Sequence, residues 1–214
     1  MGETSRYQQV ENEYYRENVT KCVMSDSVLW PTIEKCGLSF VYADGSTSSR
    51  VVMIGEAPGK DEVKYGRPFA GKAGSILDEI LLKTGINRQD LYITNTVKYR
   101  LAKPGSREGT IRNRPIKPVE ITYSLDWLRH EIEVIKPKLI LTLGNVPLRA
   151  MLTMQNCDII PISDCHGKLI DINVRTNKIT LIPLYHPASQ IYNQRLKAVF
   201  EEDFHKVKQI YSEF

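Results

Sequence analysis

Four short runs of mostly apolar residues divide the chain into a regular pattern. They are Arg50–Ile54, Leu91–Val97, Leu139–Leu143 and Ile179–Leu184. Each run is rich in β-branched residues and is bounded by polar or turn-forming residues, which is typical of strands buried on both faces. We therefore expect four buried strands.

Apolar residues between and after these runs recur every three or four positions, which predicts helices with one apolar face. The first such face stops before Gly85, the second stops before Pro137, and the third lies near the C-terminus. The apolar positions are Ile76, Leu77, Ile80 and Leu81; Ile121, Leu125, Leu128, Ile132 and Ile135; and Leu196, Val199, Phe200, Phe204, Val207 and Ile210. Alternating strands and helices predict an α/β fold, a three-layer α/β/α sandwich with a central, mainly parallel four-stranded sheet.

The length and composition of the chain are sufficient for one substantial core. It has 214 residues, of which 42% are hydrophobic. We expect a single domain in which residues 1–49 form a helical or irregular lead-in and residues 50–214 form the core. No stretch approaches the roughly 18 consecutive apolar residues of a membrane span, and the polar N-terminus lacks a secretory signal. The expected protein is a soluble, cytoplasmic monomer with no membrane partner.

Positive charge is concentrated in one segment of the chain. The formal net charge of +4 is too small to indicate a partner. Between residues 98 and 117, however, seven basic residues stand against Glu108 alone: Lys98, Arg100, Lys103, Arg107, Arg112, Arg114 and Lys117. Clustered cations on a loop can neutralise several nucleic-acid phosphates. The segment is either a nucleic-acid contact or a solvated loop.

Polar side chains stand where three of the predicted strands end. Glu56 follows the first strand, Asn95 lies near the end of the second, and His186 follows the fourth. The carboxyl ends of parallel strands meet at one edge of a sheet, which is where ligands bind in such folds. Phe69 lies in the loop after the first strand. The pattern predicts a small polar pocket with an aromatic wall.

A second interpretation concerns residues 66–73, which read G-x-x-x-x-G-K-A and are close to a phosphate-binding loop. Ala73 stands where that loop needs a hydroxyl for Mg²⁺, and Pro68 removes one amide donor. The segment also begins eleven residues after the first strand ends rather than at the strand-to-helix turn. A nucleotide hydrolase is therefore the less favoured alternative.

Longer motifs point to a particular family. The segments GEAPGKDEVKYGRPFAGKAGSILDEIL, YITNTVKYR, NRPIKPVE, LTLGNVPLRAML, HGK and YHPA occur in this order. Together they resemble the motif series of the family-4 uracil-DNA glycosylases over roughly residues 50 to 205. The resemblance implies a monofunctional DNA glycosylase, an enzyme that flips a pyrimidine out of DNA and hydrolyses its N-glycosidic bond, with uracil as the default substrate.

The resemblance also implies roles for individual residues. Phe69 matches the aromatic residue that stacks on the base, and Asn95 matches the amide that hydrogen-bonds the pyrimidine edge. His186 is expected to donate to the pyrimidine O2 and stabilise the departing anion. Glu56, Glu62 and Asn113 match polar residues that hold the pocket loop and the attacking water, although Glu62 could equally serve only to fix the loop.

Two small residues complete the predicted base-binding set. Ala57 stands where other branches of the superfamily carry an aspartate, and Gly55 lets the backbone approach the base. The predicted catalytic residues are thus Glu56, Glu62, Asn113 and His186, and the predicted base-binding residues are Gly55, Ala57, Phe69 and Asn95.

DNA contacts follow from the same resemblance. Ile191 or Tyr192, just after the HPA motif, would fill the gap that the extruded base leaves, unless they only begin the last helix. The full predicted DNA-binding set is Lys98, Arg100, Lys103, Arg107, Arg112, Arg114, Gln190, Ile191, Tyr192 and Arg195.

The chain departs from the family at two places. Family members ordinarily carry four cysteines that hold an iron–sulfur cluster, but Tyr99 and Ser124 stand at two of those positions. Neither a phenol nor a hydroxyl can replace a thiolate in the usual cluster, so we predict no cluster, no other metal and no cofactor. A site rebuilt from Cys22, Cys36, Cys157 and Cys165 is the alternative.

The second departure is a longer basic loop at residues 101–112. A chain with this loop and without the cluster could have changed its substrate. A pyrimidine with a larger substituent, such as those of modified phage DNA excised in antiviral defence, and a non-catalytic DNA-binding relative therefore remain alternatives at this stage.

Overall fold

The computed structural model describes residues 3–213, and a five-stranded sheet lies at its centre in the order β2-β1-β5-β7-β6. Four strands are parallel: β1 (Val51–Gly55), β2 (Leu91–Asn95), β5 (Leu139–Leu143) and β7 (Asn177–Leu184). The four predicted strands and their parallel arrangement are therefore confirmed.

The sheet nevertheless has five strands rather than the predicted four. The fifth strand, β6 (Ile170–Val174), pairs antiparallel with β7 at one edge. Its apolar residues alternate with Asp171 and Asn173, because one face of this edge strand is exposed. It therefore lacks the continuous apolar run by which the other strands were recognised.

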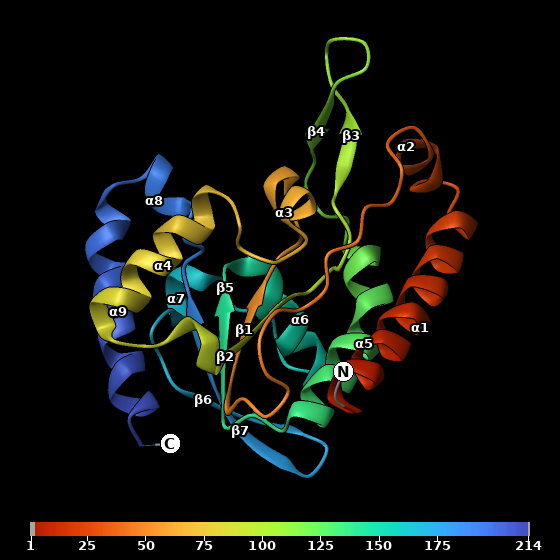
Figure 1. The fold of residues 1–214 in the computed structure, drawn as a ribbon. Helices are drawn as coiled ribbons and strands as arrows, with labels where there is room; N and C mark the ends of the chain where they lie inside the picture. Colours follow the sequence, from red (N-terminus) through yellow and green to blue (C-terminus); the bar gives the residue numbers. More distant parts are fainter. Residues whose placement is uncertain (1–2, 214) are drawn as a thin grey trace.

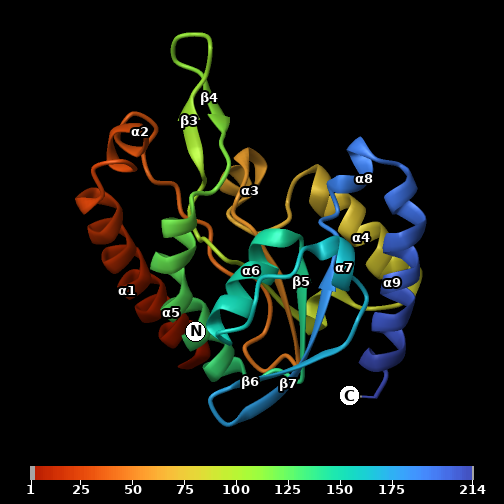
Figure 2. The ribbon, with the colours of Figure 1, turned by 180° about the vertical axis from the view of Figure 1, so that it is seen from behind.

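Helices cover both faces of the sheet (Figures 1 and 2). One face packs against α4 (Lys72–Thr84) and α9 (Arg195–Tyr211), and the other against α5 (Pro118–Ile135) and α6 (Asn145–Met154). Side chains of β1 alternate between the two cores, Val51 and Met53 toward α4 and α9, Val52 and Ile54 toward α5 and α6. The predicted three-layer architecture is confirmed.

A third apolar cluster joins the lead-in to the core. The helices α1 (Glu3–Ser25) and α2 (Trp30–Glu34) lie outside α5 (Figure 1). Their buried side chains pack against residues that follow β2: the cluster contains Tyr15, Val19, Val23, Leu29, Ile33, Val97, Tyr99 and Leu101. The lead-in is thus largely helical.

Several short elements gather at the carboxyl edge of the sheet. The predicted basic loop is a two-stranded antiparallel hairpin, β3 (Ala102–Pro104) and β4 (Ile111–Asn113), which projects beyond the rest of the molecule (Figures 1 and 2). The short helices α3 (Lys60–Tyr65) and α8 (Ser189–Tyr192) lie at the same edge (Figure 1). The remaining elements are η1 (Arg88–Asp90) and α7 (Ile162–Cys165). Within residues 3–213, no helix combines the length and apolar character needed to span a membrane.

Candidate active site

A cavity of about 210 Å³ lies at the carboxyl edge of the sheet. Its lining residues in the described part of the chain are Ala57, Gly59, Glu62, Phe69, Ala73, Asn95, Asn113 and His186. Sites for drug-sized ligands usually span roughly 300–1,000 Å³, so this cavity has the scale of a single ring system. The predicted convergence of Phe69, Asn95 and His186 on one pocket is confirmed.

Asn95 is the last residue of β2 and lies opposite Gly55 in the parallel register. Only 4% of its surface is exposed. A Cβ atom at Gly55 would overlap Asn95 Oδ1 and would lie 2.8 Å from Phe69 Cζ. Glycine is therefore required here for the amide and the phenyl ring to approach each other. Among the described residues no hydrogen bond holds the Asn95 amide, so it can both donate to and accept from a ligand.

A buried ion pair fixes the backbone at the end of β2. Lys98 is 1% exposed, and its Nζ donates to the carbonyl oxygen of Asn95 and to the carboxylate of Glu131 on α5. Glu131 also accepts hydrogen bonds from the hydroxyls of Tyr92 and Thr94 on β2. Burial lowers the pKa of Lys98 below its ordinary value, while the Glu131 carboxylate partly opposes that change. The prediction that Lys98 binds DNA is therefore wrong, because its ammonium group is buried and paired with Glu131.

Arg114 requires the same correction. It is 9% exposed and donates two hydrogen bonds of 2.7 Å to the carboxylate of Glu120. The Tyr99 hydroxyl donates to the same carboxylate at 2.6 Å. A local run of basic residues reveals charge but not burial, so the sequence alone predicts that both cations contact DNA.

Phe69 forms one wall of the cavity in an unusual backbone conformation. Its φ of 51° lies in the left-handed region, which is uncommon for a residue with a side chain. Helix α4 passes so close that a Cβ atom at Gly74 would overlap the carbonyl oxygen of Phe69. The Phe69 and His186 rings lie 6.0 Å apart between centroids and are inclined by 30°. Strain of this kind persists only where surrounding contacts hold it.

Glu62 supplies those contacts. One carboxylate oxygen accepts the amide of Gly59 at 3.0 Å, and the other accepts the amides of Ala70 and Gly71 at 3.1 and 3.0 Å. The carboxylate thus joins the start of α3 to the loop that carries Phe69. This geometry favours the loop-fixing interpretation of Glu62 over direct chemistry.

His186 follows β7 and is held by the turn behind it. The main-chain amide of Ala188 donates to its Nδ1 at 3.1 Å. Burial lowers the pKa of His186 to about 4, although the nearby Glu62 carboxylate opposes the shift. The ring is therefore neutral near pH 7. Because Nδ1 is an acceptor, the single proton resides on Nε2, which is then a donor.

The other two predicted catalytic residues lie differently. Asn113, at the end of β4, lines the cavity, and its Oδ1 accepts a hydrogen bond from Arg100 Nε at 2.9 Å. Glu56 directly follows β1 and does not line the cavity among the described residues. Burial raises the pKa of its carboxyl above the ordinary value.

Most of the remaining predicted DNA contacts are accessible. Arg107, Arg112 and Arg195 are exposed, as are Ile191 at 45% and Tyr192 at 88%. Lys103 and Arg100 are partly exposed. The hairpin and α8 lie at the carboxyl edge of the sheet (Figure 1), and the lining residues Asn95, Asn113 and His186 follow or end strands at the same edge.

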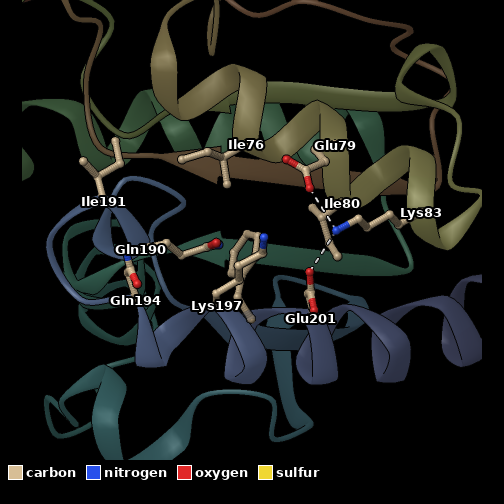
Figure 3. A pocket seen from close by; sticks show the side chains of 10 residues that line it. Ile76, Glu79, Ile80, Lys83, Gln190, Ile191, Gln194, Lys197 and Glu201 are labelled. Atoms are coloured by element: carbon tan, nitrogen blue, oxygen red, sulfur yellow. Dashed lines mark hydrogen bonds and ion pairs between the residues drawn. The ribbon is translucent and has the colours of Figure 1, made fainter.

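Gln190 is an exception, because it points into a second cavity of about 450 Å³ between α4, α8 and α9 (Figure 3). Its Nε2 is buried without a hydrogen-bond partner among the described residues. The predicted DNA contact of Gln190 is therefore not supported. Lys83 in this cavity is paired with Glu79 and Glu201. This cavity is the larger of the two, but none of Phe69, Asn95 and His186 lines it.

The residues at the expected cluster positions do not fit an iron–sulfur cluster. Tyr99 is engaged with Glu120, and Ser124 Oγ lies 3.5 Å from the Tyr15 hydroxyl. Both side chains belong to hydrogen bonds at the edge of the aromatic cluster under α1, and neither a phenol nor a hydroxyl supplies the thiolate that the usual cluster needs. Across residues 3–213, no group of three or more histidine, cysteine or acidic residues could hold a metal ion.

The phosphate-loop alternative also fails on geometry. Its glycines lie before α4, which begins at Lys72, and not at a strand end. Phe69, in the middle of the segment, is directed to the cavity wall. The segment shapes a pocket rather than a nest of amides for phosphates.

Comparisons with known proteins agree with this geometry. The model of the Uracil DNA glycosylase superfamily matches residues 42–209. A type-4 uracil-DNA glycosylase from Saccharolobus solfataricus is 35% identical over 84% of this chain and 82% of its own. Enzymes of the same name from Archaeoglobus fulgidus and Thermotoga maritima are each 33% identical, over 83% and 92% of this chain and 85% and 92% of theirs.

Proposed function

Because the chain belongs to the uracil DNA glycosylase superfamily, we propose that it is a DNA glycosylase that hydrolyses the N-glycosidic bond of uracil in DNA. The observation that carries the proposal is the meeting of Phe69, Asn95 and His186 around one base-sized cavity. A base that is stacked inside a DNA duplex cannot enter such a cavity, so the enzyme must extrude the nucleotide from the duplex.

Phe69 and Asn95 recognise the extruded base. The Phe69 ring stacks on the face of the pyrimidine, and the Asn95 amide pairs with its edge. The amide nitrogen donates to O4 and the amide oxygen accepts from N3–H of uracil. Cytosine presents an amino donor and a bare ring nitrogen at these positions, so the same amide orientation rejects it.

His186 stabilises the leaving group. As the glycosidic bond breaks, negative charge develops on the pyrimidine, and Nε2–H of the neutral ring donates to O2. A donor fixed in place before the reaction stabilises this charge without reorganisation. Burial and the Ala188 amide support this role, because together they keep the ring neutral and set its tautomer.

The sugar and the attacking water need polar groups of their own. The sugar becomes positively charged in the transition state, and a nearby carboxylate stabilises it. The Asn113 amide, which lines the cavity, is the candidate for holding the attacking water, whereas Glu56 lies outside the described lining and is given no contact with that water. Glu62 is assigned to positioning, since three main-chain amides occupy its oxygens.

The partner of the enzyme is DNA. Ile191 or Tyr192 inserts into the base stack as a wedge. Four basic side chains contact the DNA phosphates: Lys103, Arg107, Arg112 and Arg195. Arg100 positions the Asn113 side chain through the hydrogen bond that its Nε donates to Asn113 Oδ1. The enzyme acts as a single-domain monomer in the cytoplasm. A larger modified pyrimidine and a non-catalytic binding role are not favoured, because the relatives are named for uracil and the cavity is small.

The test is incubation of the purified protein with oligonucleotides that carry one uracil, thymine, cytosine or 5-hydroxymethyluracil, followed by mass spectrometry of the released bases. The proposal predicts free uracil and an abasic site. Release of a different base in preference to uracil, or of no base despite DNA binding, would refute it.

A further inference from the structure

The base of the β3–β4 hairpin forms part of the cavity rim. The two strands pair as Ala102 with Asn113, Lys103 with Arg112 and Pro104 with Ile111. Asn113 lines the cavity, and the rest of the hairpin extends away from the body of the molecule (Figures 1 and 2). Whatever occupies the cavity while still attached to DNA must therefore pass next to this hairpin.

The two faces of the hairpin differ in chemistry. Paired residues in an antiparallel ladder share a face, and successive residues alternate between faces. Pro104 and Ile111 therefore lie on the face of Asn113, toward the cavity, and Ile111 is 43% exposed. Lys103 and Arg112 share the other face. Two like charges directly opposite each other are unfavourable, and a phosphate beside them would offset that cost.

The tip of the hairpin projects beyond the other elements (Figures 1 and 2). Arg107 lies five residues after Ala102 in the chain, so at about 3.3 Å per residue it can lie up to about 17 Å from the rim. The grooves of B-DNA are about 6 and 12 Å wide. The phosphates next to an extruded base lie at the rim, whereas a side chain at the tip reaches across a groove.

The composition of the hairpin favours a duplex over a single strand. Proteins that hold single strands stack bases on aromatic side chains, but residues 102–113 contain no aromatic residue. They carry instead an exposed apolar side chain and cations, which are typical of segments that enter a groove and contact both backbones.

We infer that the β3–β4 hairpin is a duplex-binding arm: Ile111 enters the groove beside the extruded base, and Arg107 contacts the backbone of the complementary strand. Double-stranded DNA is accordingly the preferred substrate. The inference rests on the proposed function of the cavity, but it concerns a separate element and can be tested separately.

The experiment compares kcat/KM on duplex and single-stranded oligonucleotides that carry the same single uracil. The variants are Arg107→Ala, Ile111→Ala and the double variant. Lys178→Ala is the matched control, since it removes an exposed cation from the opposite edge of the sheet. For the double variant we expect the ratio of duplex to single-strand kcat/KM to fall roughly tenfold or more. The slope of duplex binding against salt should fall by about one for Arg107→Ala, and the control should match the wild type.

An unchanged ratio of duplex to single-strand kcat/KM in the double variant would overturn the inference that the hairpin binds duplex DNA, as would an equal loss of kcat/KM on both substrates. Circular dichroism establishes that the variants are folded, and Arg107→Lys should restore most of the duplex affinity because it retains the charge. If the wild type releases no uracil from either DNA, the proposed function is refuted, but the preference of the hairpin for duplex DNA can still be tested by binding. Fluorescence anisotropy with the same oligonucleotides must then show selective loss of duplex binding in the double variant, and equal binding by all variants would refute the arm.

Discussion

The main-chain amide of Ala188 donates a hydrogen bond to Nδ1 of His186, at 3.1 Å. This bond leaves the proton of the neutral imidazole on Nε2, the nitrogen proposed to face the pyrimidine O2. Burial keeps the ring neutral by lowering its pKa to about 4. The turn that follows β7 therefore determines which imidazole nitrogen of His186 is the donor. Burial determines that the ring is uncharged.

The first prediction concerns pH. The pKa of His186 is lowered in the folded state, so the neutral donor persists as the pH falls through the ordinary histidine value. We expect kcat/KM to remain level down to about pH 6 and its acidic limb to lie below about pH 5.5. A pH profile on a uracil oligonucleotide measures this. His205→Gln, at an exposed histidine on α9, should leave the profile unchanged, whereas an acidic limb at about pH 6.5 in the wild type would contradict the assignment.

The same shift has a consequence for stability. Between about pH 4 and the ordinary histidine pKa, the unfolded chain binds a proton at His186 that the folded protein does not. The contribution of His186 to stability is therefore present above that range and is lost as the pH falls through it. Urea denaturation of the wild type and His186→Gln at pH 7.5 and 5 should show a smaller decrease in the variant. Equal decreases would mean that His186 titrates normally.

Asn95→Ala should remove base recognition but not DNA binding. The amide makes two hydrogen bonds to uracil in the proposed complex, and losing them should lower kcat/KM by about 10- to 100-fold. Asn173→Ala on the exposed face of β6 is the matched control. Single-turnover cleavage and anisotropy, measured in parallel, separate the two effects. Wild-type cleavage by Asn95→Ala would exclude the amide from recognition.

Glu62→Ala should loosen the loop that holds Phe69. Three amides lose a charged acceptor, so we expect a loss of about 2–4 kcal/mol in the free energy of unfolding together with a lower kcat. Urea denaturation and single-turnover kinetics measure the two quantities. Glu17→Ala, on the exposed side of α1, should change neither. If Glu62→Ala lost activity at full stability, Glu62 would have a direct chemical role instead.

The buried Lys98–Glu131 pair yields a prediction that separates it from DNA contacts. Lys98→Met leaves Glu131 uncompensated and should lower the free energy of unfolding by about 3–5 kcal/mol, whereas adding Glu131→Leu should recover part of that loss. Neither variant should change the salt slope of DNA binding, because Lys98 is not exposed. A salt slope of DNA binding that is smaller by about one in the double variant would show that Lys98 contacts a DNA phosphate.

The sequence predicted the parallel strands and the pocket for the same physical reason. Buried parallel strands form continuous apolar runs, and their carboxyl ends bring Asn95 and His186 to one edge of the sheet regardless of the loops between them. The sequence did not predict β6 because exposed residues interrupt its apolar run: Asp171 and Asn173 are exposed. The sequence misplaced Lys98 and Arg114 for different reasons: Glu131 lies 33 residues from Lys98, whereas Glu120 lies only six residues from Arg114 but meets it inside the protein. Burial of a charge depends on tertiary contacts that a local run of basic residues does not reveal.

The roles of the supporting residues were harder to predict. The overlap that a side chain at Gly74 would make with Phe69 depends on how α4 passes the loop. The Ala188 amide on His186 depends on the conformation of a short turn. Residue types alone could predict that Phe69, Asn95 and His186 line one cavity, but not the contacts that hold them in place.

The most direct test of the account is single-turnover release of uracil by the wild type and His186→Ala, with DNA affinity measured in parallel. Loss of one fixed donor to the leaving group should lower the cleavage rate about 10²- to 10³-fold, and the Kd for DNA should stay close to the wild-type value. Cleavage by His186→Ala at the wild-type rate would contradict the central claim that this cavity performs the chemistry.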